Sequence, residues 1–435
     1  MLAGPEEVVA VGRKRTLIIG LDGVPYSLLV DLAARGVMPN VGDLLGDGVL
    51  RRMRPTIPDV SSVSWSSIIT GRNPGEHGVF GFTYLIRGTY TLAFHDFTKL
   101  RAPAFWQADP SRRYIIINVP STYPALKLNG FMVSGFVSPD LDRAVYPPSY
   151  VRYLRELGYR IDIDVERCRK SPLLLFKELS EVLRSRLELC KKVWKKVKWD
   201  VLMFVITGTD RLGHFLWNAY EDADQEWHEH FLSFFEQVDE AIGELAGKLK
   251  DRDDLIMLSD HGMERLRVEV NLNALLASEG YLVLGEEARR GYNNIRAGTR
   301  AFALEPSRIY LNLEGKFPRG SVKPGEAEEL LEELADFFGR LRWNGKKIVK
   351  RVYRKEEIYR GPYLAEAPDM VLVPNEGFAF NARISGREAF RKSELSGKHN
   401  EDAFLYVRGR ENEDLVPGEP SVEDVVGIMM ALRER

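Results

Sequence analysis

The chain has 435 residues, and its 61 Lys and Arg side chains nearly balance 63 Asp and Glu side chains, which gives a formal net charge of -2. A protein that coats nucleic acid usually carries a basic excess because its affinity comes from neutralising phosphates, so this near balance argues against that class. The composition, 44% hydrophobic and 29% charged, is that of a folded globular protein and excludes a disordered or fibrous chain.

The amino-terminal segment and the cysteines indicate a cytoplasmic protein. Glu6 and Glu7 precede a short apolar run that Asp22 interrupts, an order that does not predict a signal peptide. No apolar run reaches the roughly 18 residues of a membrane-spanning helix. Cys168 and Cys190 lack CxxC spacing, which predicts buried thiols rather than a disulfide or a zinc knuckle. The scarcity of Gln beside many Glu, Lys and Arg is typical of proteins from hot environments, so we expect a thermophile.

Short, continuous apolar runs recur along the chain, and polar residues follow most of them. The first run, Thr16–Leu21, ends in Asp22-Gly23 and is followed by helical spacing over Tyr26–Arg35. Continuous rather than alternating apolar runs predict strands that are covered on both faces, as in an α/β sandwich. The further runs of this kind are Tyr114–Val119, Val201–Thr207, Asp254–Ser259 and Asp369–Val373.

Long helices are predicted between and after these strands. Apolar stripes run along Pro172–Lys196 and Gln225–Leu249, which favours packing of both helices against the sheet. The last helix, Ser421–Arg435, begins with a serine that can cap it, followed by Glu423 and Asp424 in the first turn. We expect the apolar residues of this helix to dock on the sheet as well.

Two stretches depart from this alternation and are predicted to be insertions. Residues 78–112 are rich in aromatic residues, Gly and Thr, and residues 265–360 combine an acidic helix with a basic, strand-like segment. We therefore expect a core formed by residues 15–264 and 361–435. Residues 265–360 would form an inserted cap or substrate subdomain, and residues 78–112 a smaller insertion.

Candidate metal ligands stand at the carboxyl ends of the predicted strands and in one polar loop, and strand-end loops of a parallel sheet converge on one crevice. Each residue alone is more typical of a helix cap, a turn or a structural histidine, but six in matching positions favour a metal site. Carboxylate oxygen and imidazole nitrogen both suit zinc, and six ligands exceed one tetrahedral ion. Enzymes that catalyse displacement at phosphorus commonly hold two divalent ions close together. The residues are Asp22, Asp210, His214, Asp260, His261 and His399.

A hydroxyl-rich turn leads into another predicted helix. Ser61, Ser62 and Ser64 precede the apolar segment Trp65–Ile69, and Thr70-Gly71 closes it. A serine at a helix N-terminus lies where the helix dipole and free N–H groups favour an anion, including a phosphoryl group. The alternative is that one of these serines only caps the helix.

The order of these motifs resembles that of a known family. LIIGLDG, SSVSWSSIITGRNPGEHG, TGTDRLGH, LSDHGM and GKHN follow one another between residues 17 and 400. These motifs are similar to those of the alkaline phosphatase superfamily and, within it, to those of the type I phosphodiesterase/nucleotide pyrophosphatase family. The resemblance spans nearly the whole chain. It implies an alkaline-phosphatase-like three-layer α/β/α sandwich with a mostly parallel central sheet and inserted cap segments.

The resemblance also implies roles for single residues. Ser61 would be the nucleophile and would form a covalent phospho-Ser61 intermediate. One divalent metal ion would be held by Asp22, Ser61, Asp260 and His261. The other would be held by Asp210, His214 and His399. Zn is the expected ion, with Mn or Mg as alternatives. The substrate would be a small-molecule phosphate ester or a nucleotide, and its binding residues are not indicated.

The family resemblance leaves alternatives open. Nucleotide-cleaving relatives commonly place an Asn just after the segment that here reads His77-Gly-Val-Phe-Gly-Phe82, and this chain has none there. We favour a phosphodiesterase or nucleotide pyrophosphatase. A phosphomonoesterase is the nearest alternative, and a non-catalytic relative that binds metals or a partner through residues 265–360 is another. A sulfatase is excluded because Ser61 is not followed by the required Pro and Arg, and a Ser-His-Asp hydrolase lacks its GxSxG turn.

Other polar residues receive weaker predictions. His228 and His230 are expected to be solvated or to cap a helix, and His77 to lie in a turn. His95, in the first insertion, is a candidate for substrate contact. Three cations are candidates for contact with phosphate: Arg72, Arg211 and Lys398. The aromatic residues of the first insertion are expected to pack together rather than to stack on a base.

Overall fold

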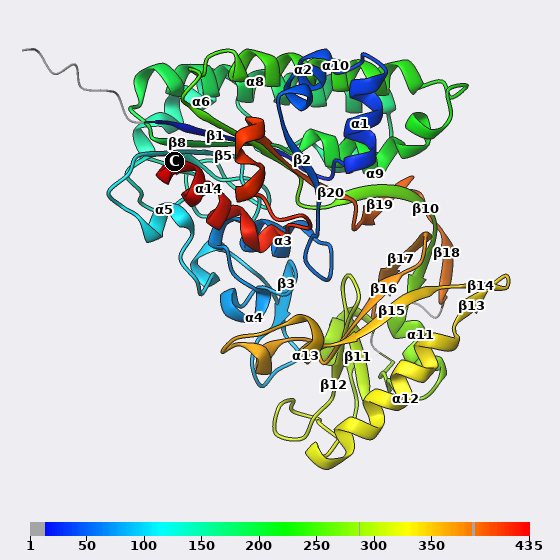
Figure 1. The fold of residues 1–435 in the computed structure, drawn as a ribbon. Coiled ribbons are helices and arrows are strands. Elements are labelled where there is room, and N and C mark those ends of the chain that lie inside the picture. The colour runs from blue at the N-terminus through cyan, green and yellow to red at the C-terminus, as the bar shows by residue number, and fades with distance from the viewer. Residues whose placement is uncertain (1–13, 287, 385–387) are drawn as a thin grey trace, which may run out of the picture.

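The computed structural model describes residues 14–286, 288–384 and 388–435, which form a larger and a smaller lobe (Figure 1). The larger lobe is built on an eight-stranded sheet in the order β2-β20-β9-β1-β8-β5-β6-β7. The central pairs β9-β1, β1-β8, β8-β5 and β5-β6 are parallel, and the three outer pairs are antiparallel. The predicted α/β class with a mostly parallel central sheet is confirmed. In chain order the strands are β1 (Thr16–Leu21), β2 (Gly48–Met53), β5 (Tyr114–Ile117), β6 (Gly130–Val133), β7 (Val145–Tyr146), β8 (Val201–Ile206), β9 (Asp254–Leu258) and β20 (Ala403–Arg408).

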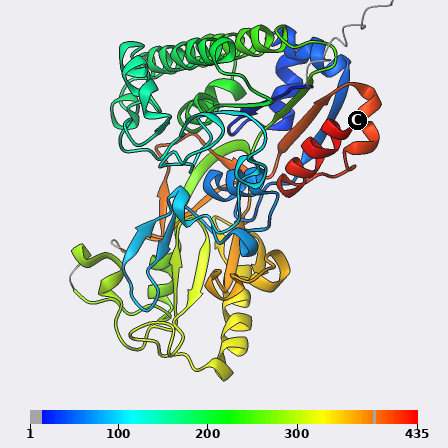
Figure 2. The ribbon, with the colours of Figure 1, turned by 90° about the vertical axis from the view of Figure 1, so that its left-hand side faces the viewer.

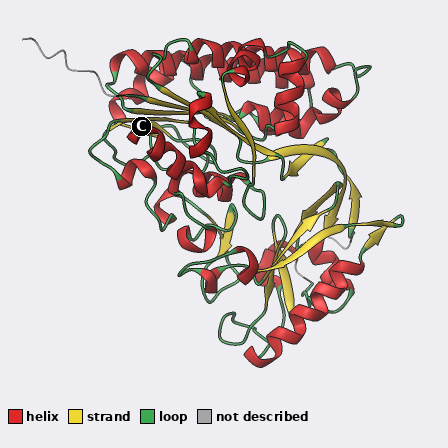
Figure 3. Ribbon diagram, in the orientation of Figure 1, coloured by secondary structure: helices red, strands yellow, loops and turns green. Residues whose placement is uncertain are grey.

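Helices cover both faces of this sheet, which gives three layers (Figure 3). One face carries α1 (Tyr26–Ala34), α2 (Pro39–Gly46), α6 (Val151–Glu156), α7 (Val165–Cys168), α8 (Pro172–Lys196), α9 (Gly208–Glu221) and α10 (His228–Ala246). The other face carries α3 (Ser61–Thr70), α4 (Pro74–His77), α5 (Phe105–Ala108) and α14 (Val425–Glu434). Strand β1 explains the continuous apolar run, since Leu17 and Ile19 face the first layer and Ile18 faces the second.

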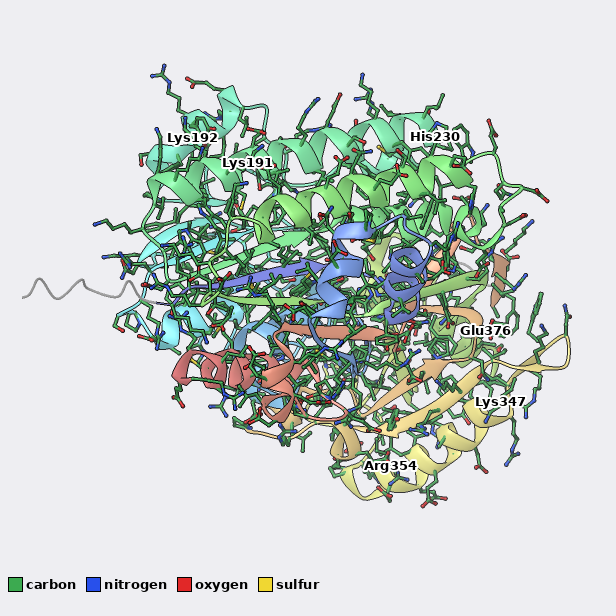
Figure 4. All side chains as sticks on the ribbon, turned by 45° about the horizontal axis from the view of Figure 1, so that its top comes forward. Lys191, Lys192, His230, Lys347, Arg354 and Glu376 are labelled. Carbon is green, nitrogen blue, oxygen red and sulfur yellow. The ribbon has the colours of Figure 1, made fainter. Side chains whose placement is uncertain are left out.

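The predicted helices agree with the structure except at their ends. Helix α8 has the predicted bounds, whereas α10 begins three residues later, at His228, and ends at Ala246. The carboxyl-terminal helix begins at Val425, after a short 3-10 turn whose capping serine, Ser421, bonds Asp424. Side chains of the outer layer such as Lys191, Lys192 and His230 project away from the sheet (Figure 4).

The smaller lobe contains its own sheets and core. Strand β10 (Gly262–Asn271) leaves the larger lobe and runs into the smaller one, where it pairs with β17 and β18 (Figure 2). A four-stranded sheet in the order β11-β12-β16-β15 lies beside it. The strands are β11 (Ala301–Leu304), β12 (Arg308–Leu311), β13 (Arg342–Trp343), β14 (Lys346–Lys347), β15 (Val349–Arg354), β16 (Met370–Pro374), β17 (Gly377–Asn381) and β18 (Phe390–Lys392). Strand β19 (Gly397–Asn400) follows them and pairs with the first residues of β10. The helices are α11 (Leu272–Ser278), α12 (Ala327–Arg340) and α13 (Lys355–Ile358).

The chain returns to the larger lobe later than residue 361, the boundary expected from the sequence. The apolar run at 369–373 forms β16, which pairs with β12 and β15 rather than with the central sheet. An apolar run shows that a strand is buried but does not show which sheet buries it. We therefore propose that the inserted subdomain extends from residue 265 to about residue 396, just before β19.

The first insertion bridges the two lobes. It contains the hairpin of β3 (Thr83–Leu85) and β4 (Leu92–Phe94). Tyr90 is buried in the core of the smaller lobe, where its hydroxyl donates to Asn312 Oδ1 at 2.7 Å, whereas Phe97 is buried in the larger lobe. Packing of these aromatic side chains therefore agrees with the expectation, except for Phe94, which is 68% exposed.

Neither lobe offers a membrane span: among the described residues, every helix is too short or too polar to cross a bilayer. Cys168 and Cys190 are free and buried, as the sequence predicts.

Close packing of β1 against α3 yields a stability prediction. A Cβ atom at Gly20 would lie 2.4 Å from the Trp65 ring and 3.0 Å from Val205 Cγ2. We expect Gly20→Ala to lower the free energy of unfolding by about 1–3 kcal/mol through overpacking, measured by urea denaturation. The control is Gly339→Ala in α12, where a Cβ meets nothing within 4 Å and the change should be neutral or stabilising. Equal effects of the two substitutions would contradict this account.

Candidate active site

Sheet register brings the predicted ligands to one edge of the central sheet. Leu21 of β1 pairs with Ile206 of β8, and Gly20 pairs with Leu258 of β9, so the segments that follow all three strands leave at the same level. Strand β19 reaches this edge by pairing with β10, with Met263 opposite His399. The seven predicted residues therefore meet although they are spread over most of the chain: Asp22, Ser61, Asp210, His214, Asp260, His261 and His399.

One group of side chains, the first ligand set, consists of Asp22, Asp260 and His261, all fully buried. His261 Nε2 lies 3.2 Å from Asp260 Oδ2 and 3.7 Å from Asp22 Oδ1. Ser61 Oγ is 3.1 Å from the same nitrogen. The serine hydroxyl therefore stands directly beside the first ligand set.

The second ligand set consists of Asp210, His214 and His399. Asp210 Oδ1 lies 3.3 Å from His214 Nε2 and 3.2 Å from His399 Nε2, and the two nitrogens are 2.9 Å apart. The His399 ring stacks on that of His261, with centroids 3.6 Å apart. The two ligand sets are thus immediate neighbours.

Backbone carbonyl groups orient the three imidazoles. The Nδ1 atoms of His214, His261 and His399 lie 3.0, 3.0 and 2.8 Å from the carbonyl oxygens of Gly397, Gly262 and Asp59. A carbonyl oxygen only accepts, so each Nδ1 carries a proton. When a ring is neutral, its Nε2 presents an unshared electron pair to its ligand set, which is the arrangement that metal-binding histidines usually have.

The buried carboxylate oxygens that lack hydrogen-bond partners indicate whether each ligand set could hold a cation. Within the part of the chain that the structure describes, Asp22 Oδ1, Asp210 Oδ1 and Asp260 Oδ2 are buried without a hydrogen-bond partner. When both rings are neutral, the facing Nε2 atoms of His214 and His399 are both acceptors and cannot bond each other. Buried acceptors that face one another repel unless a cation lies between them. Both sets therefore fit a divalent metal ion with oxygen and nitrogen ligands.

The pKa shifts of the ligand residues also favour a bound cation. Burial, together with the neighbouring carboxylates Asp260 and Asp210, raises the pKa of Asp22. Burial also raises the pKa of Asp260 and lowers the pKa of His261. Burial acts in the same direction on Asp210, but the two imidazoles of its set outweigh it and hold the pKa of Asp210 well below its usual range. A cation in the first set would favour the ionised carboxylates and the neutral imidazole together.

Ser61 does not cap helix α3, because the N-cap residue is Val60. The other serine hydroxyls of this helix have different tasks: Ser64 Oγ bonds Thr56 and Ser66 Oγ donates to the Ser62 carbonyl. Ser61 opens the first turn, and its hydroxyl faces His261. This placement favours the anion-binding interpretation over the capping alternative.

Two residues that sequence reasoning missed hold the carboxylates in place. Trp65 Nε1 donates to Asp22 Oδ2 at 3.2 Å, and the Gly23 amide donates to Asp260 Oδ1 at 3.2 Å. Gly23 has φ +69, and a Cβ there would lie 3.0 Å from Asp210 Oδ1, so only glycine fits. Two features of the sequence could have indicated these residues: the tryptophan one helical turn after Ser61, and the glycine directly after Asp22.

The cations suggested for phosphate contact already have partners. Arg211 Nη2 lies 2.6 Å from Asp162 Oδ2, and its Nη1 lies 3.4 Å from Asp210 Oδ2. Lys398 lies 2.6 Å from Glu264, and Arg72 is 60% exposed. Arg211 also borders a cavity of about 500 Å³ that is lined by Phe136–Leu141 and Tyr159–Ile163. This cavity lies next to the second ligand set through Arg211.

The remaining histidines lie apart from the ligand sets. His77 is buried and its Nε2 bonds Ser67 Oγ at 2.9 Å, and the His95 ring packs against Tyr84 at an interplanar angle of 44°. His230 is exposed as predicted (Figure 4). His228 is buried rather than solvated, and its Nδ1 bonds the Ala219 carbonyl in the last turn of α9 at 2.7 Å, which agrees with the capping alternative and ties α10 to α9.

A family model decides the classification. Residues 16–402 match the model of the type I phosphodiesterase/nucleotide pyrophosphatase family. The chain belongs to this family. Membership supports hydrolysis of phosphate esters and agrees with the resemblance seen in the sequence. No curated protein matches the chain in a sequence comparison.

Solved structures with the same fold include two kinds of enzyme. Phosphonoacetate hydrolase from Sinorhizobium meliloti 1021, in complex with phosphonoacetate, has a TM-score of 0.66 at 18% identity, covering 97% of this chain and 95% of that chain. Murine ectonucleotide pyrophosphatase/phosphodiesterase 5 has a TM-score of 0.55 at 15% identity, with the same coverage, and its inactive form is known in complex with AMP. At these identities the similarity shows the alkaline-phosphatase-like fold alone.

The two ligand sets predict the metal stoichiometry. We expect about two divalent ions per chain, falling to one in Asp22→Asn and to one in Asp210→Asn, because each substitution removes a buried carboxylate from a different set. Elemental analysis after dialysis measures this. Asp31→Asn, which removes a carboxylate paired with Arg35 on the surface, is the control and should retain both ions. Chelation should lower the melting temperature of the wild type, since the ions bind only the folded chain. Unchanged metal content in both site variants would contradict the assignment.

Proposed function

We propose that the protein is a two-metal hydrolase of phosphate esters, either a phosphodiesterase or a nucleotide pyrophosphatase, that acts through a phospho-Ser61 intermediate. The observation that carries this proposal is the position of Ser61 Oγ, at the start of α3 and 3.1 Å from His261 in the first ligand set, with the second set stacked directly beside it. A nucleophile next to two cation sites is what in-line displacement at phosphorus requires.

Two divalent ions held by the ligand sets, most suitably Zn with Mn or Mg as alternatives, would favour the ionised Ser61 hydroxyl and stabilise charge on the leaving oxygen. Ser61 Oγ releases its proton to solvent and attacks phosphorus, the bond from phosphorus to the leaving oxygen breaks, and the leaving oxygen takes up a proton from solvent. Water then cleaves the phospho-Ser61 ester and restores the hydroxyl. The free N–H groups in the first turn of α3 stabilise the phosphoryl oxygens throughout.

Charge at the site favours diesters over monoesters. A monoester dianion carries one more negative charge than a diester and needs additional cationic side chains. Arg211 and Lys398 are already paired with Asp162 and Glu264. Their charges are therefore largely neutralised by the protein, which supports a diester or pyrophosphate substrate. The cavity beside Arg211 is the place where we propose that one arm of such a substrate lies.

The compartment that we propose is the cytoplasm. The two cysteines are free and buried, which is typical of a reducing environment.

Replacement of the nucleophile tests the mechanism. We expect Ser61→Ala to lose about 10³-fold or more of the wild-type kcat for a nitrophenyl phosphodiester, with an unchanged melting temperature. Ser62→Ala is the matched control, because Ser62 Oγ is buried and has no hydrogen-bond partner in the described part of the chain, and it should retain activity. Full activity of Ser61→Ala would contradict the covalent route.

Parallel assays with a nitrophenyl monoester separate the alternatives. Faster turnover of the monoester than of the diester would assign a phosphomonoesterase. Failure to turn over either compound, with two metals bound, would assign a non-catalytic relative.

A further inference from the structure

A second polar pocket lies at the amino-terminal ends of the central parallel strands, whereas the ligand sets lie at their carboxyl-terminal ends. Its volume is about 220 Å³, and Lys14, Ser111, Arg112 and Arg433 line it. Lys14 precedes β1, Ser111 and Arg112 precede β5, and Arg433 belongs to the end of α14. We call it the basic pocket. The six residues of β1 separate this end from Asp22, a distance of about 20 Å at 3.3 Å per residue.

Contacts between distant segments build the basic pocket. Lys14 Nζ donates to the Leu432 carbonyl at 2.6 Å and lies 2.8 Å from Asp254. Arg433 Nη1 donates to Thr16 Oγ1 at 3.1 Å and to the Asp200 carbonyl at 3.0 Å. The start of β1 and the end of α14 are therefore fixed side by side (Figure 1). The pocket is thus formed by the folded sheet and its last helix together.

Three of the four lining residues are cations, and none is an acid. The nearby carboxylates are already engaged: Asp254 with Lys14, Asp109 with Arg112 at 2.6 Å, and Asp200 with Arg113 at 2.8 Å. Lys14 and Arg112 are thus paired with carboxylates, whereas Arg433 has no ion-pair partner among the described residues, so the wall of the pocket keeps a net positive charge at Arg433. Such a wall attracts an anion.

Arg433 supplies the observation that points to a ligand. Its side chain is half-buried and lines the pocket, and no carboxylate among residues 14–286, 288–384 and 388–435 forms an ion pair with it. The two acceptors of Nη1 are uncharged oxygens. Burial and the nearby Arg112 lower the pKa of Arg433. A half-buried guanidinium with a like charge beside it and no carboxylate partner is stabilised by an oxyanion in the pocket, which accepts from it in a charge-assisted hydrogen bond.

We propose that the basic pocket binds a phosphate group, contacted by Arg433, Arg112 and Lys14. The volume of about 220 Å³ is below the 300–1,000 Å³ typical of pockets for drug-sized ligands. It therefore admits inorganic phosphate or the phosphoryl end of a small phosphomonoester, but not a whole nucleotide. The site stands apart from the ligand sets and does not depend on the proposed catalysis.

Calorimetric titration of the metal-loaded protein with sodium phosphate at constant ionic strength tests the proposal. We expect an Arg112-dependent binding event that Arg112→Gln weakens at least 10-fold, because it removes one of three cations. Arg152→Gln is the control, since Arg152 is 90% exposed and its substitution makes the same change in charge. The event should persist in Asp210→Asn, which separates it from phosphate bound at the ligand sets. Lys14→Gln is a second variant and should weaken the same event.

Titration with glycerol phosphate distinguishes the two sources of the phosphate group. Tighter Arg112-dependent binding of glycerol phosphate would assign a phosphomonoester, and tighter binding of inorganic phosphate would assign the free ion. Equal weakening by Arg112→Gln and Arg152→Gln, or the absence of an Arg112-dependent event with both compounds, would overturn the proposal.

Discussion

Repulsion among buried acceptors at one edge of the central sheet is the constraint on which the rest of the structure depends. Asp22, Asp210 and Asp260 are buried within a few ångströms of three imidazoles whose Nε2 lone pairs face them. Such an arrangement is unfavourable by itself, so it has to be held by the surrounding fold. Strand register fixes the carboxylates, and carbonyl oxygens fix the rings. The two faces of the sheet provide the rigid, water-free support that this requires.

Helix α3 shows how one short segment serves both packing and chemistry. Trp65 fills the space over Gly20 and also bonds Asp22, one helical turn after Ser61. The helix that carries the proposed nucleophile is therefore joined to Asp22 of the first ligand set by its own Trp65 side chain. A helix buried along its whole length cannot shift without disturbing the sheet beneath it. The distance between Ser61 and the first ligand set is thus a property of the core.

The sequence predicted the fold class and the residues of the candidate site, because both follow from patterns that are contiguous in the chain. Asp22 and Asp260 follow apolar runs directly, and the four-residue spacing of Asp210 and His214 lies within one helix. What it missed depends on contacts between distant segments. The pairing of β16 with β12 and β15 is invisible in an apolar run. Burial of His228 depends on the neighbouring helix α9, and the basic pocket joins residues more than 400 positions apart.

Strand β10 begins one residue after His261 and continues without interruption into the smaller lobe, while β19 pairs along its first residues and carries His399. A rotation of the smaller lobe would therefore displace residues of both ligand sets. Access to the site has to be gained by side chains and loops at its rim rather than by swinging the lobes apart. For the same reason the smaller lobe is not a removable accessory: excising residues 265–396 would leave only the first three residues of β10, Gly262–Glu264, to pair with the strand that carries His399.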